Sequence, residues 1–306
     1  MVTNLVSIRQ TTPHQTLRPK VSVVIPALNE ERNLPFVAAR MPTVIDEVVF
    51  VNGDHRDRTS EVALELWPDG IHVRQTRKGK GNALACGLAA ATGDIIVMID
   101  ADGSTDPAEI PRFVAALMSG ADFAKGSRFI EGGGSADITP IRRLGNKGLN
   151  ELVNVLFTLK YTDLCYGYNA LWRRCLDVIE LPDVAAREPQ WGDGFEIETL
   201  INVRLAASGA KIAEVPSYEA NRIYGTSNLN AVTDGLRVLS TIRREFHSSH
   251  NKSKVTAGNR LRQLDSHKPV TASAPTGPSV VYMNSSRHQR HGVRRLNNGV
   301  HESELI

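Results

Sequence analysis

The strongest constraint on the fold of this chain is a run of five apolar residues, 95–99, that ends abruptly at Asp100, Ala101 and Asp102. An apolar run of this length is typical of a buried strand in a parallel sheet. Open α/β sheets bind ligands at the carboxyl ends of their strands, where these two acids fall. Neighbouring carboxylates repel each other and resist burial, whereas a divalent cation, Mg²⁺ or Mn²⁺, would neutralise them. An ordinary acidic turn is the simpler explanation of the same residues taken alone.

Apolar runs alternate with helical segments through the first half of the chain. We predict strands at residues 21–26, 47–51, 71–75, 95–99 and 122–128. Helices are predicted between them at residues 30–40, 59–67, 83–91 and 107–119, with Asn29 capping the first. Strictly alternating strands and helices predict an α/β fold with a largely parallel sheet covered by helices.

The pattern changes after residue 130. Residues 131–135 are rich in glycine, and this composition fits either a plain linker or a mobile lid. A helix is predicted over residues 140–159, followed by a strand at 163–172, a helix at 195–207, a strand at 211–216 and a last helix at 229–246. Helical spacing of the apolar residues of 149–157 is typical of a core-facing helix. With Arg142, Arg143 and Lys147 at one end, that stripe could also lie on a membrane surface.

Charge and composition limit the cellular setting. The formal net charge is +3, and the basic excess lies in residues 247–306, so the rest of the chain gives no reason to expect nucleic acid as a partner. The three cysteines suggest neither a metal site nor a disulfide framework. No apolar run approaches a membrane span, and the first residues lack the apolar core of a signal peptide. We expect a cytoplasmic protein, and a peripheral contact with the cytoplasmic face of the membrane stays open.

Three regions follow from these patterns. Residues 1–20 are expected to be a loose leader, residues 21–246 the folded domain, and residues 247–306 a disordered basic tail. Within the domain, residues 77–82 combine glycines with Arg77, Lys78 and Lys80 just before a helix. Such a turn can hold an anion at the helix N-terminus, although a solvated basic turn is the simpler alternative. Its spacing is not that of a Walker loop.

Six short motifs occur in an informative order. They are Pro-Ala-Leu-Asn-Glu at 26–30, the turn at 52–59, Lys-Gly-Lys-Gly at 78–81, Asp-Ala-Asp at 100–102, Gly-Ser-Arg at 126–128 and Asn-Arg-Ile-Tyr-Gly at 221–225. In this order they resemble family 2 glycosyltransferases, in particular the branch of dolichyl- or polyprenyl-phosphate sugar synthases. The resemblance covers roughly residues 20–246. It implies the GT-A fold, a Rossmann-like, mostly parallel sheet flanked by helices. Residues 21–130 would form the nucleotide-sugar half, and 131–246 an α+β acceptor half.

The resemblance also implies roles for individual residues. The donor would be a UDP- or GDP-linked hexose, and the acceptor a polyprenyl phosphate. Arg128 and Arg222 would face the acceptor phosphate or the donor diphosphate, and Arg142 a lipid phosphate. The residues implied in donor and metal binding are Pro26, Ala27, Asn29, Glu30, Asn52, Lys80, Asp100, Ala101 and Asp102, with Asp100 and Asp102 holding the ion. Leu28 and Asn52 stand where the family usually has an aromatic residue and an aspartate, so the identity of the nucleotide base, uracil or guanine, stays open.

The expected reaction is a single displacement that inverts the anomeric centre. A phosphate acceptor is already an anion, whereas a sugar hydroxyl needs a carboxylate to take its proton. Asp163 is our first candidate for that group, because it begins a predicted strand after the glycine-rich segment; Arg128 is placed with it as catalytic. The alternatives are Asp193, Glu196 and Glu198.

Other functions stay open. They are transfer to a soluble acceptor, nucleotidyl transfer and non-catalytic binding of a sugar nucleotide. A nucleotidyltransferase would normally carry a glycine-rich loop with arginine directly after its first strand, where this chain has Pro-Ala-Leu-Asn-Glu.

Overall fold

A central sheet organises the protein in the computed structural model, which describes residues 18–226 and 230–251. Its strands are β1 (Val21–Ala27), β2 (Glu47–Asn52), β3 (Ile71–Arg74), β4 (Ile95–Met98), β5 (Phe123–Ser127), β7 (Asn169–Trp172) and β8 (Ile212–Pro216). They are ordered β3-β2-β1-β4-β7-β5-β8, and only β7 runs antiparallel to its neighbours. The α/β prediction with a largely parallel sheet is therefore confirmed.

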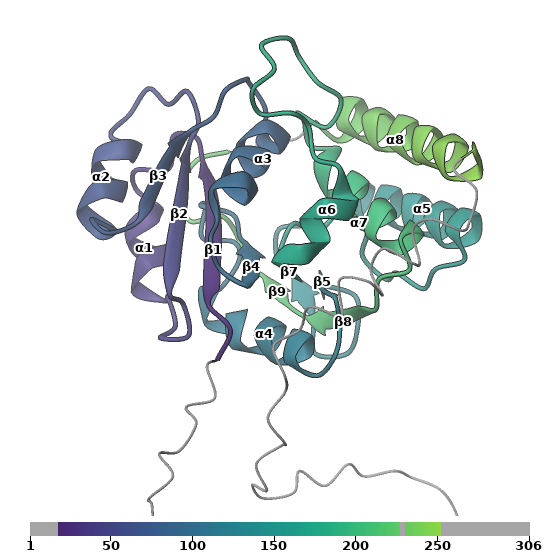
Figure 1. Ribbon diagram of the computed structural model, residues 1–306, viewed down its shortest axis with the longest axis horizontal. Helices are drawn as coiled ribbons and strands as arrows, with labels where there is room; N and C mark the ends of the chain where they lie inside the picture. Colours follow the sequence, from purple (N-terminus) through teal and green to yellow (C-terminus); the bar gives the residue numbers. More distant parts are fainter. Residues whose placement is uncertain (1–17, 227–229, 252–306) are drawn as a thin grey trace, which may run out of the picture. The chain divides into compact units, whose positions relative to one another are not determined.

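Helices cover both faces of this sheet (Figure 1). Their bounds are α1 (Leu34–Ala39), α2 (Thr59–Leu66), α3 (Lys80–Ala90), α4 (Ile110–Met118), α5 (Pro140–Phe157), α6 (Leu176–Ile179), α7 (Ile197–Ala207) and α8 (Ala231–Asn251), with short 3₁₀ turns at Pro107–Glu109 and Arg173–Cys175. One core packs α1, α2 and α4 against the sheet, and a second packs α3, α6 and α7 against the other face. Neighbouring residues of β4 serve both cores, because Val97 belongs to the first and Ile96 to the second. Burial on both faces explains why the strand is a continuous apolar run.

The helices α5, α7 and α8 form a third core beside the sheet. Val153 of α5 and Ile242 of α8 are fully buried in it, and the rings of Phe157 and Phe246 meet edge to face at 5.9 Å. The predicted apolar stripe (Leu149, Leu152, Val153, Leu156 and Phe157) thus packs inward, into this core and not onto a membrane surface. Helix α8 continues to Asn251, so the predicted boundary at residue 246 falls inside a helix. The leader through residue 17 and the tail from residue 252 lie outside the described residues.

Several local predictions need correction. The glycine-rich segment 131–135 was predicted to be a linker or a mobile lid. Its end is instead paired, because β6 (Gly134–Ser135) and β9 (Tyr218–Glu219) form a small parallel sheet. Asn29 does not cap a helix: its φ is 60°, and its side chain accepts a hydrogen bond from Arg56 N at 2.7 Å. The first helix begins at Leu34 instead.

Glu47, at the start of β2, ties three neighbouring segments together. It accepts hydrogen bonds from Lys20 Nζ at 2.8 Å, Ser22 Oγ at 2.6 Å and Thr92 N at 2.8 Å. Burial alone would raise its pKa, but these donors outweigh burial and lower the pKa to about 2. A carboxylate with a depressed pKa stabilises the fold above its unfolded pKa, and that contribution is lost as pH falls to the folded value.

We therefore expect Glu47→Gln to lower the free energy of unfolding by roughly 2 kcal/mol at pH 7. The difference from the unmodified chain should shrink as pH falls from about 4.5 to 2. Urea unfolding of both proteins across this pH range measures it. A penalty that stays constant with pH would show that packing, and not the carboxylate charge, carries the effect.

Candidate active site

The carboxyl ends of β1, β2 and β4 meet at one edge of the sheet. Ala27 of β1 is in register with Asn52 of β2, and Gly53 N donates to Ala27 O at 2.8 Å. Val24 of β1 is in register with Met98 of β4, two residues before Asp100. The structure therefore brings together the predicted nucleotide segments at 26–30 and 52 and the acids at 100–102, with Ala101 buried.

Arg222 joins two of these segments through ion pairs. Its NH2 lies 2.7 Å from Asp102 Oδ2 and its NH1 3.0 Å from Glu30 Oε1. The side chains of Glu30 and Asp102 are only 10% and 11% exposed, so the pairs are shielded from water. Burial raises the pKa of Glu30 above its usual value, against the opposing effect of Asn33 and Arg222. Arg222 thus links the end of β1 to the end of β4.

The segment around Arg222 is fixed to the start of α1. Tyr224 N donates to Asn33 Oδ1 at 3.0 Å, and Asn33 Nδ2 donates back to Tyr224 O at 3.1 Å. The guanidinium of Arg32 lies 3.8 Å from the centre of the Tyr224 ring. These contacts hold residues 222–224 across the strand ends and aim Arg222 at Asp102.

Lys80 makes the corresponding link to Asp100. Its Nζ lies 2.7 Å from Asp100 Oδ1 and 2.8 Å from Glu198 Oε1, in the first turn of α7. Burial alone would lower the pKa of Lys80, but the two carboxylates raise it above its ordinary value. A Cβ at Gly167 would lie 3.2 Å from both Lys80 Nζ and Glu198 Oε1, so the backbone of that loop closes one side of the cluster. Glu198 was an alternative candidate for the base in the sequence analysis, and the structure shows it as a buried member of this site.

The basic turn at 77–82 binds the chain itself. Gly81 N and Asn82 N donate to Asp193 O at 2.8 and 3.1 Å, which uses the amides that were predicted to hold an anion. Arg77 donates through Nε and NH2 to the Asp193 carboxylate, both at 2.8 Å, and through NH1 to the carbonyls of Asp183 and Ala186. Asp193 is therefore a structural partner of this turn and not a free base.

Gly81 makes this docking sterically feasible, since a Cβ there would lie 1.8 Å from Gly192 O. We expect Gly81→Ala to lower the free energy of unfolding by roughly 1–3 kcal/mol, because backbone must shift at this contact. Transfer activity should fall too, as Lys80 is displaced. Gly145→Ala on α5 is the matched control: a Cβ there meets nothing within 4 Å, so the fold should gain about 0.5–1 kcal/mol. Thermal or urea unfolding of both variants measures these changes, a loss of stability for Gly81→Ala and a gain for Gly145→Ala.

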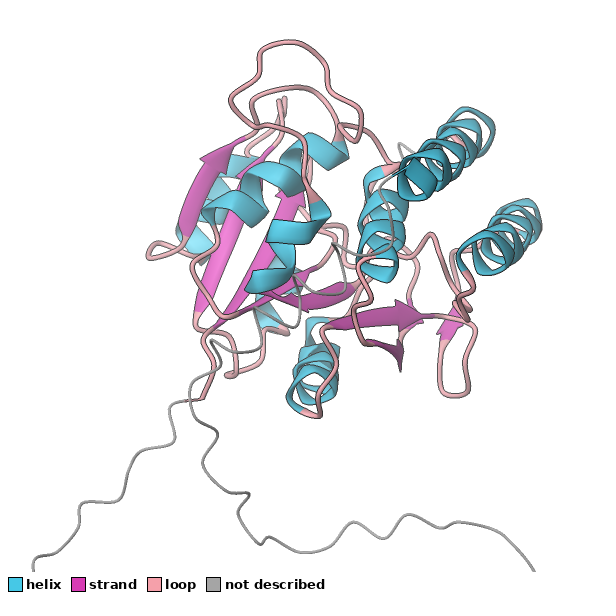
Figure 2. Cartoon of the chain, turned by 45° about the vertical axis from the view of Figure 1, so that its right-hand side comes forward, coloured by secondary structure: helices cyan, strands magenta, loops and turns pink. Residues whose placement is uncertain are grey.

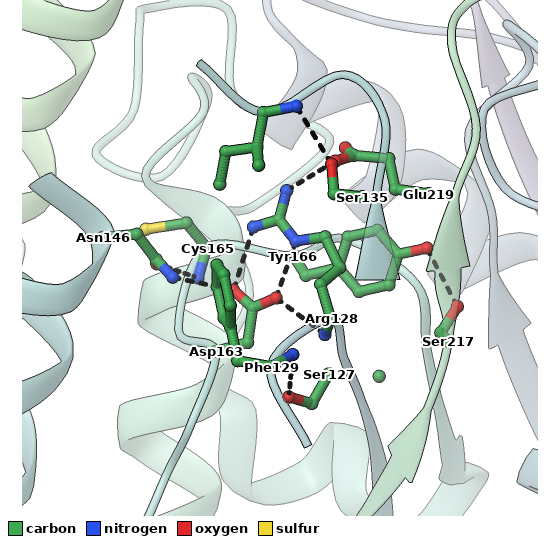
Figure 3. Close-up of polar contacts among 12 residues, drawn as sticks. Ser127, Arg128, Phe129, Ser135, Asn146, Asp163, Cys165, Tyr166, Ser217 and Glu219 are labelled. Carbon is green, nitrogen blue, oxygen red and sulfur yellow. Dashed lines mark hydrogen bonds and ion pairs between the residues drawn. The ribbon is translucent and has the colours of Figure 1, made fainter. Parts of the chain in front are cut away.

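A second charged cluster lies beyond β5, around Arg128 (Figure 3). Arg128 donates to the two oxygens of Asp163 through Nε at 2.7 Å and NH2 at 2.9 Å, and through NH1 to Glu219 Oε2 at 2.9 Å. Its guanidinium lies 4.7 Å from the centre of the Tyr166 ring. Burial alone would lower the pKa of Arg128, but the two carboxylates raise it above its ordinary value. Arg128 is thus held as a buried, permanently charged group.

Asp163 is fully buried and fully engaged. Besides the guanidinium, Arg128 N donates to its Oδ2 at 3.1 Å and Asn146 Nδ2 to its Oδ1 at 3.0 Å. It lies in a loop and does not begin a strand, because β7 starts only at Asn169. A carboxylate held by several donors and shielded from solvent is suited to orienting Arg128, and the structure gives no support for a general-base role.

Arg142 lies at the start of α5, in neither of these clusters. Its NH1 pairs with Asp137 Oδ2 at 2.9 Å, and its side chain is one-quarter exposed. One helical turn further on, Asn146 reaches the Arg128 cluster through Asp163. The same helix therefore carries Arg142 at the surface and a support of Arg128 in the interior.

Glu196 also lies outside the cluster of Lys80, Asp100 and Glu198. Its Oε1 accepts hydrogen bonds from Gly192 N and Gly194 N at 3.1 and 3.3 Å. These contacts hold the turn that docks on α3. Glu196 was among the sequence candidates for a base, and its contacts make it a support of this turn instead. Glu219 was not singled out in the sequence, because its partner Arg128 lies 91 positions away in the chain.

Asp100 and Asp102 offer the oxygen donors that Mg²⁺ and Mn²⁺ prefer. Within residues 18–226 and 230–251, no three His, Cys, Asp or Glu side chains converge in a metal-binding group. Two carboxylates without a complete protein cage suit an ion that shares its coordination with substrate phosphates and water. The residues present therefore fit a divalent ion bound together with a phosphorylated ligand.

Comparison with known proteins agrees with this geometry. The sequence model described as Glycosyl transferase family 2 matches residues 22–179. Dolichol-phosphate mannosyltransferase of Pyrococcus furiosus is 32% identical over 70% of this chain, and the match spans 60% of that relative's length. Polyprenol monophosphomannose synthase of Mycolicibacterium smegmatis is 33% identical over 70% of this chain and 83% of the relative.

Solved structures show the same fold. Glucosyl-3-phosphoglycerate synthase of Mycobacterium tuberculosis, crystallised with Mg²⁺ and UDP, superposes with a TM-score of 0.58 at 22% identity, covering 75% of this chain and 80% of that one. At this identity the likeness supports the fold alone. Together with the family match over about half of the chain and the relatives above 30% identity, it places this chain among the family 2 glycosyltransferases, as an enzyme with the GT-A fold.

Proposed function

We propose that this chain is an inverting, metal-dependent hexosyltransferase that uses a UDP- or GDP-linked sugar and transfers the hexose to a polyprenyl phosphate. One observation carries the donor half of the proposal: Asp100 and Asp102 follow β4, each ion-paired with a cation, beside the segments at the ends of β1 and β2. The acceptor half rests on the relatives, which are named for mannosyl transfer to polyprenol or dolichol phosphate. Mannose is therefore the first sugar to test.

Asp100 and Asp102 would hold Mg²⁺ or Mn²⁺. When bound, the ion would offset the negative charge that develops on the leaving diphosphate. Lys80 and Arg222 supply fixed positive charge at the same two carboxylates, and both are held by further ion pairs, to Glu198 and Glu30. Such preorganised charge stabilises a developing anion without reorganisation during the reaction.

The nucleoside would lie along the ends of β1 and β2. We assign its base and ribose to Pro26, Ala27, Asn29, Glu30 and Asn52. Asn29 and Asn52 have their side chains engaged with Arg56 N and Ser60 Oγ, so the backbone shape of this edge is fixed. A rigid edge of the sheet would select between the uracil and guanine bases of the donor by their shape.

The acceptor would approach from the part of the chain after residue 130. We assign its phosphate to Arg128 and Arg142, and we divide the domain into a donor half, 21–130, and an acceptor half, 131–246. An acceptor phosphate is already an anion, so no base is required, which agrees with the engaged state of Asp163. If the acceptor were a hydroxyl, Glu198 would be the better base, because it is one cation away from Asp100.

A product assay tests the proposal. The full chain is incubated with Mg²⁺ or Mn²⁺, a panel of UDP- and GDP-hexoses, and either polyprenyl phosphate or phosphoglyceric acid as acceptor. We expect mass spectrometry to find one lipid-linked hexose, together with the free nucleoside diphosphate. Product in the phosphoglyceric acid arm alone would establish a soluble acceptor. Donor binding by calorimetry without turnover in either arm would favour a non-catalytic binding module.

A further inference from the structure

The outward face of α5 is apolar, although the helix packs its other face into the third core. Ile141, Leu144 and Val155 recur on this outer side with exposures of 77%, 73% and 76%. A Cβ at Gly145 or Gly148 would meet nothing within 4 Å, so the surface between them is open. None of them belongs to the core-facing stripe, which consists of Leu149, Leu152, Val153, Leu156 and Phe157. Helix α5 therefore carries more apolar side chains than its packing into the third core requires.

Helix α8 repeats the pattern. Val232, Leu236 and Leu239 follow one another at spacings of four and three residues, and their exposures are 70%, 59% and 44%. Val238 and Ile242, on the opposite side of the helix, are buried in the third core. Scattered exposed leucines need no explanation, but two stripes on neighbouring helices indicate an interaction surface.

Cations accompany both stripes. Exposed basic side chains are Arg143 and Lys147 on α5 and Arg237, Arg243 and Arg244 on α8. Across the described part of the chain, no carboxylate lies within ion-pair distance of these five groups. Glu151 is the acid exposed among them on α5. Ser240, Arg243, Arg244 and His247 line a surface hollow of about 450 Å³ along α8, which offers phosphate groups a basic lining.

We propose that the outer faces of α5 and α8 form a docking surface for an anionic lipid bilayer. The two helices lie outside α7, on the side of the protein away from β1–β3 (Figures 1 and 2). Exposed apolar side chains flanked by cations are the pattern of a helix that lies in the membrane interface. Across the described residues, no helix has the length and apolarity of a membrane span, so the contact is peripheral.

Charge favours a bilayer over a second copy of this chain as the partner. A two-fold symmetric dimer through these faces would bring the exposed cations beside the stripes, such as Lys147 and Arg243, close to their own copies. Such a like-charge arrangement costs affinity, whereas anionic head groups would neutralise the cations. The surface is also connected to the acceptor side, since α5 carries Asn146, which hydrogen-bonds to Asp163 in the Arg128 cluster.

Vesicle sedimentation tests the surface with the full chain. The vesicles contain phosphatidylcholine alone or with phosphatidylglycerol. We expect binding to the anionic vesicles, and a loss of about tenfold or more in the pairs Ile141→Glu/Leu144→Glu and Leu236→Glu/Leu239→Glu. Arg143→Gln/Lys147→Gln should weaken binding to anionic vesicles only, and more so at low salt. The matched control is Leu64→Glu/Met118→Glu on α2 and α4, where exposures are 52% and 56% and no loss is expected.

Three outcomes would overturn the inference: no binding by the unmodified chain, equal losses in the control, or a dimer that the Leu236→Glu/Leu239→Glu pair converts to a monomer in light scattering. Circular dichroism confirms that each variant is folded. The docking surface rests on the proposed function in one respect: a lipid acceptor is the reason for the protein to bind a membrane. Transfer to a short-chain polyprenyl phosphate in detergent should survive the substitutions on α5 and α8. Vesicle binding without any transfer would therefore contradict the proposed function alone, and transfer without vesicle binding the docking surface alone.

Discussion

Replacing Asp102 by asparagine should lower glycosyl transfer by about 10²–10³-fold while the protein stays folded. The amide keeps the shape of the carboxylate and its contact with Ser104 N, which donates to Asp102 Oδ1 at 2.9 Å. It removes the negative charge that faces Arg222 and that would hold the divalent ion. Initial rates with saturating donor, measured over a range of Mn²⁺ concentrations, test this. The loss should include a higher Mn²⁺ requirement.

Asp69→Asn is the control for this substitution, because Asp69 is an exposed residue of the turn before β3. Its rates should match those of the unmodified enzyme. Chelation of divalent ions by EDTA should abolish transfer, and Mg²⁺ or Mn²⁺ should restore it. Full activity of Asp102→Asn, or activity that resists EDTA, would remove the metal from the proposal and leave Lys80 and Arg222 as the only charges at the leaving group.

Breaking the Arg128–Asp163 pair should produce the largest loss of stability. Asp163→Asn leaves a buried guanidinium, with 4% of its side chain exposed, without its main counter-charge. Removal of one partner from a buried ion pair costs about 3–5 kcal/mol, because the remaining charge is desolvated and unpaired. Urea unfolding at neutral pH measures the free energy. The double substitution Arg128→Met/Asp163→Leu should recover part of it, since no buried charge is then left alone.

The Arg142–Asp137 pair provides the comparison. Its side chains are 25% and 37% exposed, so Asp137→Asn should change the free energy of unfolding by less than about 1 kcal/mol. An opposite result at Asp163 would be equally informative. If Asp163→Asn left stability unchanged but abolished transfer, and the pH dependence of the rate changed with it, Asp163 would be the base that its hydrogen bonds argue against.

The strands at the centre of the sheet could be predicted from sequence because they are buried on both faces. The apolar runs at 21–26, 47–51 and 95–99 agree with β1, β2 and β4 to within one residue at each end. The strand predicted at 163–172 was too long, and β7 covers only its last four residues. The large side chains of Leu164, Tyr166 and Tyr168 alternate with smaller ones, as in a strand. Tertiary contacts hold this segment in a loop instead: Asp163 engages Arg128, and Tyr166 hydrogen-bonds to Ser217.

Acids at the end of an apolar strand are a readable signal, and the structure places Asp100 and Asp102 just after β4, as predicted. Glu198 was named only as an alternative base, because an acid in the first turn of a helix is ordinarily a surface charge. Its burial depends on α7 packing beside α3, which brings together Lys80 and Glu198, 118 positions apart in the sequence. Arg77 was read as part of an anion cradle for the same reason: its partner, Asp193, lies in a loop far along the chain.

The place of β7 in the sheet has a consequence for how the protein is made. Strands β4 and β5 both lie in the proposed donor half, yet they are joined only through β7, which lies in the proposed acceptor half. A ribosome that has released residues 21–130 has therefore produced strands that cannot yet close into one sheet. The gap is filled when residues 169–172 emerge, and the sheet is completed when β8 follows. Contacts so distant in sequence are slow to form, so the proposed donor and acceptor sites are expected to mature together, late in synthesis, as parts of one cooperative unit.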